Sequence, residues 1–266
     1  MTSAPFDMRT HLGAGAPDLP NPAVETFRML MRYLSPYQFN PLNINPLRDV
    51  IERFVDFDAV RKCTDVSLFI SATNVQTGRL HVFPQGEISA DVIMASACLP
   101  SLFHAVEIDG VPYWDGGYMG NPALFPFFRA TETEDVLIVQ INPIERKTTP
   151  HTQTEIMNRI NEITFNSSLL AEFRAIDFVT RLIDQGKLPR GLGEGQYRRI
   201  NVHRIALDSS FKELTASSKL NSDFDFFEML KTGGQRAARN FLSEHFDDIG
   251  VRGTVDLGAE AKAEGA

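Results

Sequence analysis

The chain has 266 residues, of which 43% are apolar and 23% are charged, and its formal net charge is −8. This length is enough for one large domain or two small ones, and the composition is that of an ordinary globular protein. The negative charge argues against nucleic-acid binding, which needs a basic face, and against electrostatic docking on anionic lipid. Any membrane contact would therefore be apolar.

The N-terminal part predicts two helices and no targeting segment. No apolar stretch typical of a signal peptide is visible, and no run of 18 apolar residues predicts a transmembrane helix. The first helix is expected from Asn21 to Ser35, and a loop rich in proline and asparagine follows at 36–46. Asn45-Pro46 starts the second helix. The apolar residues of this second helix recur with helical spacing: Leu47, Val50, Ile51 and Phe54.

From residue 65 the pattern changes to strands and turns. Residues 66–73 are apolar and β-branched, which predicts a buried strand, and 79–83 returns from it. A helix from Ser89 to about Cys98 must end before Pro100. A second hairpin at 107–114 turns at Asp109-Gly110. Residues 136–141 form a short, fully apolar strand, which is typical of a sheet covered on both faces.

Beyond residue 150 the sequence is mostly helical. We expect one long amphipathic helix to Gly186, a strand at 199–207 and two helices near 226–230 and 235–246. Residues 253–266 are small and polar, which predicts a disordered tail. The alternation of strands and helices predicts an α/β layered fold, and the hairpins make its sheet mixed.

Three segments stand in order between residues 71 and 117. Ser71-Ala72-Thr73-Asn74 ends the buried strand, Ala95-Ser96-Ala97-Cys98-Leu99-Pro100 ends the helix, and Asp115-Gly116-Gly117 follows the second hairpin. Each alone has an ordinary interpretation, as a turn or a packed helix end. Together, over residues 45–145, they resemble the patatin-like phospholipases, in which the aspartate of an Asp-Gly-Gly or Asp-Gly-Ala motif is the general base of a Ser-Asp dyad.

The resemblance implies a three-layer α/β/α fold with a mixed central sheet and a lipid acyl hydrolase activity. Asp115 would be the proton acceptor, and Gly116 and Gly117 would let the backbone pass close to the nucleophile turn. The expected partner is a lipid ester, with apolar contact to a membrane surface. No metal or cofactor is implied. The cysteines, Cys63 and Cys98, form no disulfide framework and favour a reduced, cytoplasmic setting.

The nucleophile is the missing part, because no serine lies in a Gly-x-Ser-x-Gly elbow. Ser3, in Thr2-Ser3-Ala4, is a candidate that lacks both glycines and a preceding strand. Gly13-Ala14-Gly15 is a poor substitute for an oxyanion loop. We therefore expect an N-terminally truncated domain: a partial catalytic part at 1–150, a mainly helical part of the same domain at 151–252, and the tail at 253–266.

Other interpretations stay open. A separate chain could supply the serine, or the protein could be a non-catalytic lipid-binding or scaffold protein that kept the fold. His104 could lie near Asp115, although a packing or surface role is the simpler expectation. Residues 122–128, Pro-Ala-Leu-Phe-Pro-Phe-Phe, could contact lipid or start a buried helix. Arg198, Arg199 and Arg204 fit a solvated strand face better than a phosphate site.

Overall fold

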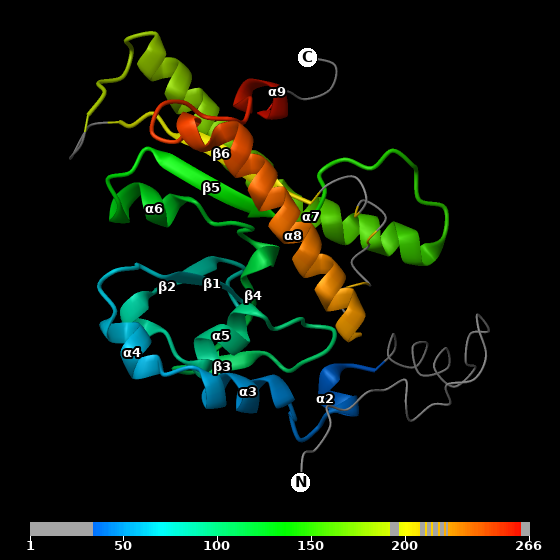
Figure 1. Ribbon diagram of the computed structural model, residues 1–266. Helices are drawn as coiled ribbons and strands as arrows, with labels where there is room; N and C mark the ends of the chain where they lie inside the picture. Colours follow the sequence, from blue (N-terminus) through cyan, green and yellow to red (C-terminus); the bar gives the residue numbers. More distant parts are fainter. Residues whose placement is uncertain are drawn as a thin grey trace.

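The computed structural model describes residues 34–191, 197–207 and 223–261, together with Phe211, Leu214, Ser218 and Asn221. Ser3, Gly13 to Gly15 and nearly all of the helix predicted from Asn21 lie outside these residues. Figure 1 shows two small sheets, one above the other, with helices packed around each. The lower sheet is built from residues 69–115 and the upper one from residues 135–206.

The first sheet has four antiparallel strands in the order β2-β1-β4-β3. Its β1 pairs with β4 so that Ala72 faces Asp115 and Thr73 faces Trp114. Asp109 and Gly110 both have positive φ, 51° and 77°, which suits an Asp-Gly hairpin turn, and the predicted second hairpin is confirmed. The strand bounds are β1 (Phe69–Asn74), β2 (Leu80–Pro84), β3 (Val106–Ile108) and β4 (Val111–Asp115).

The first predicted strand is shorter than expected. Residues 66–68 precede β1, and Val66 is 56% exposed. The strand was predicted to start at Val66 because the stretch is apolar, but such residues also occur in exposed connections. The buried core beneath the sheet comes from β1, β2, β4 and helix α5: Ala72, Phe83, Val92, Ala95 and Tyr113.

Short helices surround this sheet. Two predicted caps are confirmed: the Asn45 side chain accepts from Leu47 N at 3.2 Å, and Ser89 Oγ accepts from Val92 N at 3.3 Å. The loop expected at 36–46 contains a one-turn helix, which Ser35 caps. The bounds are α2 (Pro36–Phe39), α3 (Pro46–Phe54), α4 (Phe57–Lys62), the 3₁₀ turn η1 (Gln85–Glu87) and α5 (Ala90–Ser96).

The second sheet has two parallel strands, β5 (Asp135–Gln140) and β6 (Asn201–Ala206). The long helix α7 (Gln153–Asp184) connects them, as the sequence predicts. Before β5 lie the 3₁₀ turn η2 (Gly116–Tyr118) and helix α6 (Phe125–Ala130). Because β5 precedes residue 150 and β6 follows it, this sheet spans the expected boundary. Its core comprises Leu124, Ile138, Leu169, Phe173, Ile176 and Val202.

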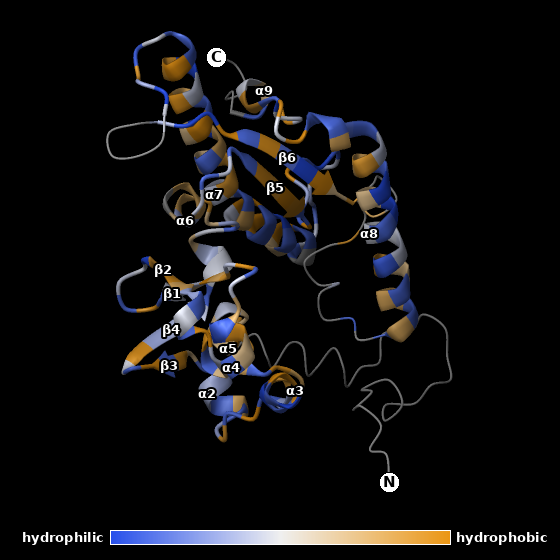
Figure 2. Cartoon of the chain, turned by 60° about the vertical axis from the view of Figure 1, so that its left-hand side comes forward, coloured by the Kyte–Doolittle hydropathy of each residue, from blue (hydrophilic) through white to orange (hydrophobic). Residues whose placement is uncertain are grey.

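One face of β5 is open to solvent. Leu137 and Val139 are 48% and 70% exposed, whereas Ile138 between them is buried, and Ile141, directly after the strand, is 72% exposed. The prediction of a sheet covered on both faces is therefore wrong for β5. On that face α8 (Phe224–His245) contacts β6, where it covers His203 with Phe241. Figure 2 shows β5 as a largely hydrophobic strand beside β6.

Two predictions for the C-terminal part are wrong. The two expected helices form the single helix α8, which runs through Gly233 and Gly234. Residues 253–261 are ordered rather than a disordered tail, since Thr254 N and Val255 N donate to Val202 O and α9 (Leu257–Ala261) follows. Between α8 and this segment lies the 3₁₀ turn η5 (Phe246–Asp248). Residues 262–266 lie outside the described part.

The fold class is α/β with both antiparallel and parallel strands, as predicted. The strands divide between two sheets within the described residues instead of joining one mixed sheet. In the part of the chain that is described, no helix is long and apolar enough to cross a membrane.

Candidate active site

Asp115 lies at the end of β4, where three neighbouring segments hold its backbone. Its N–H donates to Cys98 O at 2.9 Å, at the end of α5. Its carbonyl oxygen accepts from Thr73 Oγ1 of β1 at 2.8 Å. Its own carboxylate oxygen Oδ1 accepts from Gly117 N at 2.7 Å and so caps η2. The aspartate, half-buried, is therefore fixed by β1, by α5 and by its own turn.

Both glycines of the motif are required by close packing. A Cβ atom on Gly116 would lie 2.3 Å from Ser71 O and 2.5 Å from Ser71 Oγ. A Cβ on Gly117 would lie 2.3 Å from the Phe165 ring of α7. Contacts this short are excluded for real carbon atoms, so each position accepts only glycine without a local shift. The turn is thus packed between the first sheet and the long helix.

Burial and the charge of Asp115 both raise the pKa of two nearby side chains, Tyr118 and Cys98. Burial raises the pKa of Tyr118, and the Asp115 carboxylate raises it further. Burial also raises the pKa of Cys98 to about 11, and Asp115 acts in the same direction. Cys98 is therefore a protonated thiol at neutral pH, and it donates to His104 O at 3.1 Å. The Tyr118 ring lies 5.3 Å from that of Phe165.

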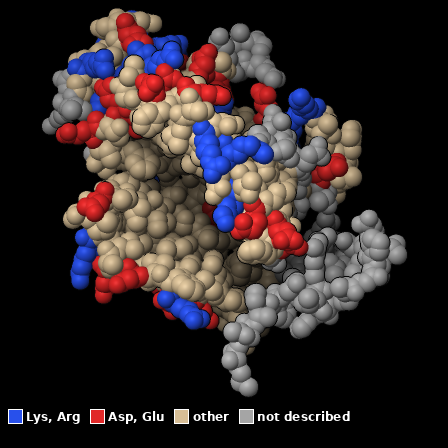
Figure 3. Space-filling model, in the orientation of Figure 1, with Lys and Arg blue, Asp and Glu red and all other residues tan. Residues whose placement is uncertain are grey.

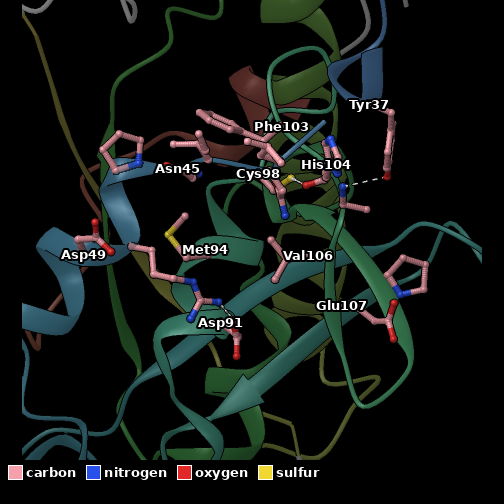
Figure 4. A pocket seen from close by; sticks show the side chains of 17 residues that line it. Tyr37, Asn45, Asp49, Asp91, Met94, Cys98, Phe103, His104, Val106 and Glu107 are labelled. Atoms are coloured by element: carbon pink, nitrogen blue, oxygen red, sulfur yellow. Dashed lines mark hydrogen bonds and ion pairs between the residues drawn. The ribbon is translucent and has the colours of Figure 1, made fainter. Parts of the chain in front are cut away.

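A cavity of about 800 Å³ is lined in part by Cys98, the residue whose carbonyl oxygen accepts the hydrogen bond of Asp115 N. Buried Met94 and Cys98 are among its lining residues, and charged Asp49, Asp91 and Glu107 are at its edges. Figure 4 shows Asp49 and Glu107 on opposite sides of it. Its volume is that of a small-molecule site. No sequence pattern indicates this cavity, because its walls come from two separate segments, residues 37–49 and 91–112.

His104 has a packing role. Its ring stacks on Tyr37 with ring centres 4.0 Å apart, and Nε2 lies 3.2 Å from Pro36 O. These contacts attach α2 to the segment before β3. The simpler expectation for His104 is therefore confirmed, and the hydrogen bonds of its ring lead to α2.

Residues 122–128 start a buried helix rather than forming a lipid-contacting segment. Leu124 is 2% exposed, and Phe127 and Phe128 pack against the core of the second sheet. Only Phe125, at 48%, is an exposed large apolar residue in this segment. The buried-helix interpretation of the segment is the one that the structure supports.

The three arginines near β6 are engaged within the protein. Arg198 donates to the carbonyls of Phe128 and Thr131, Arg199 pairs with Asp184, and Arg204 pairs with Glu260. They do not form a shared phosphate site. Within the described ranges, no group of three or more His, Cys, Asp or Glu side chains could hold a metal ion.

Ser71 lies next to the Asp-Gly-Gly turn, although no elbow sequence surrounds it. It lies inside β1, next to Ala72, which faces Asp115 across the sheet. The pairing of β1 with β4 explains this position. Because the strands are antiparallel and Ala72 pairs with Asp115, Ser71 lies opposite Gly116. Ser71 is not on a strand-to-helix turn, so it does not have the exposed geometry of an elbow nucleophile.

Comparison with known proteins gives a match to one family model. Residues 8–128 match the family model described as patatin-like phospholipase. Over these residues the chain is similar to the patatin-like phospholipases. The match includes β1 to β4 and the Asp-Gly-Gly turn and ends within α6, so β5, α7 and β6 lie beyond it. No curated protein matches the chain.

Proposed function

We propose that this patatin-like chain takes part in the hydrolysis of lipid esters and that Asp115 is its general base. The family acts on lipid substrates, which supports the substrate class. The observation that carries the residue assignment is the Asp115 turn, whose backbone is held by Cys98 and Thr73 and whose glycines admit no side chain. Such fixation is what a catalytic carboxylate needs.

The proposed chemistry uses a serine hydroxyl and the Asp115 carboxylate. Asp115 takes the proton of the hydroxyl while the serine oxygen attacks the ester carbonyl, and the proton then goes to the leaving alcohol. Water attacks the acyl-serine ester in the second half of the reaction; the same carboxylate accepts the proton of the water and returns it to the serine oxygen as the acyl–oxygen bond breaks. The products are a fatty acid and an alcohol, and no cofactor takes part in these steps.

The nucleophile and oxyanion donors are proposed to come from outside the given residues, either from an upstream segment or from a separate chain. The sequence contains no Gly-x-Ser-x-Gly elbow, and Ser71 lies within a strand. The chain alone should then show very little turnover, since loss of a nucleophile costs several orders of magnitude in rate.

A fluorophosphonate probe tests this part of the proposal. We expect no covalent labelling of the full chain, measured by mass spectrometry, under conditions that label a patatin-like enzyme with an intact elbow. Labelling mapped to a serine of this chain, such as Ser3 or Ser71, would overturn the proposal of an outside nucleophile and identify the residue instead.

Asp115→Asn tests the base. In the chain extended at its N-terminus by the elbow-bearing segment of an intact family member, we expect kcat for a fatty acyl ester to fall by about 10²–10⁴-fold. Asparagine keeps the shape and can still accept from Gly117 N, but it cannot take the serine proton. The thermal unfolding midpoint should change little.

Asp109→Asn is the matched control for this measurement. Asp109 lies in the exposed turn of the same hairpin, and asparagine tolerates its positive φ. We expect normal turnover. Equal turnover of Asp115→Asn and the parent would mean that Asp115 is a structural turn residue, and a non-catalytic lipid-binding protein would then be the better assignment.

A further inference from the structure

Helix α3 is oriented in the opposite way to an ordinary surface helix. Arg48, on its polar side, forms an ion pair with Asp91 of α5, the neighbouring helix of the protein body. Asp49 lines the cavity beside α5. A helix on a globular protein normally buries its apolar stripe and exposes its charges. Here the charged side faces the protein.

The apolar side of α3 is in solvent. Leu47, Val50 and Phe54, which share one face at spacings of three and four residues, are 44%, 51% and 76% exposed. No residue of this helix is buried. Figure 1 places α3 at the outer edge of the molecule, with α5 and β3 between it and the second sheet. Nothing in the first sheet uses this face.

The loop before α3 extends the same apolar surface to the cavity. Leu42 and Ile44 are 80% and 62% exposed, and both also line the cavity of about 800 Å³. Hence Leu42 and Ile44 are both exposed at the outer surface and part of the cavity lining. The outer apolar face, as we name it, comprises Leu42, Ile44, Leu47, Val50 and Phe54.

We infer that the outer apolar face docks on a lipid bilayer. An amphipathic helix with a clean apolar side and charged flanks lies in the membrane interface with that side among the acyl chains. The cavity behind the rim has room for a small molecule or an acyl chain, and its lining Cys98 accepts the hydrogen bond of Asp115 N. The outer apolar face and the cavity therefore share Leu42 and Ile44, and Cys98 joins the cavity to the proposed base.

The net charge of the chain favours docking on a zwitterionic rather than an anionic bilayer. With a net charge of −8, attraction to anionic lipid is excluded as the driving force. Along α3, the positive charges of Arg48 and Arg53 are balanced by Asp49 and Glu52. Docking then rests on apolar burial, so it should occur on zwitterionic vesicles and be insensitive to salt. This inference rests on the proposed lipid function for its partner but not on the role of Asp115.

The test is co-flotation of the full chain with phosphatidylcholine vesicles. We expect binding that is unchanged between low and high salt, and a partition coefficient on the order of tenfold lower for Phe54→Glu, because an exposed phenylalanine is replaced by a charge. Phe54→Leu should bind nearly as well as the parent. Phe246→Glu is the matched control, since Phe246 is 65% exposed on η5, outside this face, and its change should leave binding intact.

Three outcomes would overturn the inference. One is that the parent chain does not float with the vesicles, and another is that Phe246→Glu weakens binding as much as Phe54→Glu. The third is that Phe54→Glu turns a dimer into a monomer in gel filtration while vesicle binding persists, which would make the face a contact between copies. Asp115→Asn should bind vesicles like the parent, so failure of the proposed base and failure of docking are separately visible.

Discussion

Gly116 packs against backbone atoms, whereas Gly117 packs against a side chain that can rotate. Gly116 approaches the backbone carbonyl of Ser71, which cannot move without disturbing β1, whereas Gly117 approaches the Phe165 side chain. A side chain can rotate away from a new methyl group more easily than a paired strand can shift. The same substitution should therefore have unequal consequences at two adjacent positions.

We predict that Gly116→Ala destabilises the protein by about 1–3 kcal/mol, the usual cost of overpacking, and more than Gly117→Ala. Thermal unfolding of the two variants measures the difference. Phe165→Leu should relieve part of the cost at Gly117 and none at Gly116. Gly86→Ala is the control, because a Cβ there has open space and its effect should be close to zero. Equal losses at Gly86 and Gly116 would refute the packing argument.

Asp135 is a second residue on which stability depends. Burial alone would raise the pKa of its carboxyl group, but hydrogen bonds from Gly250 N, His203 and Asn201 outweigh burial and lower it. Its Oδ1 lies 3.0 Å from both Gly250 N and His203 Nε2. The carboxylate thus links β5 to β6 and to the turn after α8.

The sign of the pH dependence follows from the lowered pKa. The stabilisation is present above the unfolded pKa of about 3.9 and is lost as the pH falls through the folded value. We predict that Asp135→Asn lowers the free energy of unfolding at pH 7 by about 1.5–3 kcal/mol, and that the difference shrinks at acid pH. Urea unfolding at several pH values measures it. Asp184→Asn, an exposed partner of Arg199, should cost under about 1 kcal/mol, and an equal cost would contradict the prediction.

At the scale of elements, the sequence predicted the features that depend on neighbouring residues alone. The caps Asn45 and Ser89, the Asp109-Gly110 turn and the long helix α7 were predicted from residues that act on their own backbone. The extent of α8 was not, because a glycine pair in sequence does not reveal what packs against it. The Asp115 turn was found by its motif, whereas Ser71 and the cavity depend on distant segments that only the fold brings together.

Gly233 and Gly234 in α8 make this argument testable. A Cβ on Gly233 would lie 2.3 Å from the Phe211 ring, whereas one on Gly234 would meet nothing within 4 Å. We predict that Gly234→Ala stabilises the protein by about 0.5–1 kcal/mol, as expected inside a helix. Gly233→Ala should destabilise it. Thermal unfolding compares the two, and a gain at both positions would mean that Phe211 does not restrict α8.

At the scale of the whole molecule, the two sheets differ in how well they are covered. The first encloses its core beneath α5, while Leu137 and Val139 of β5, and Ile141 directly after it, are exposed to solvent. Among the described residues β5 has β6 as its only strand neighbour, and its other edge carries no lysine or proline that would discourage association. Figure 3 shows a hollow on this side of the molecule whose visible walls carry few charges.

We predict that the chain binds a hydrophobic dye through this face of β5. Val139→Lys combined with Ile141→Lys should reduce dye fluorescence strongly, because both side chains are about 70% exposed, and should leave the melting temperature nearly unchanged. Changing Val251→Lys, on an equally exposed valine, is the control and should have a small effect. Unchanged dye binding in the double variant would show that the exposed apolar surface is elsewhere.

Strand β4 also carries an intrinsic fluorescent probe. The chain has one tryptophan, and Trp114 lies directly before Asp115 and opposite Thr73. All tryptophan emission therefore originates within one residue of the proposed base. Helices α7 and α8 contain most of the helical residues in the described part, so they supply most of the helical signal in circular dichroism, and they contribute nothing to that emission. Following both signals during denaturation would reveal, without any label, whether the two sheets unfold as one cooperative unit or one after the other.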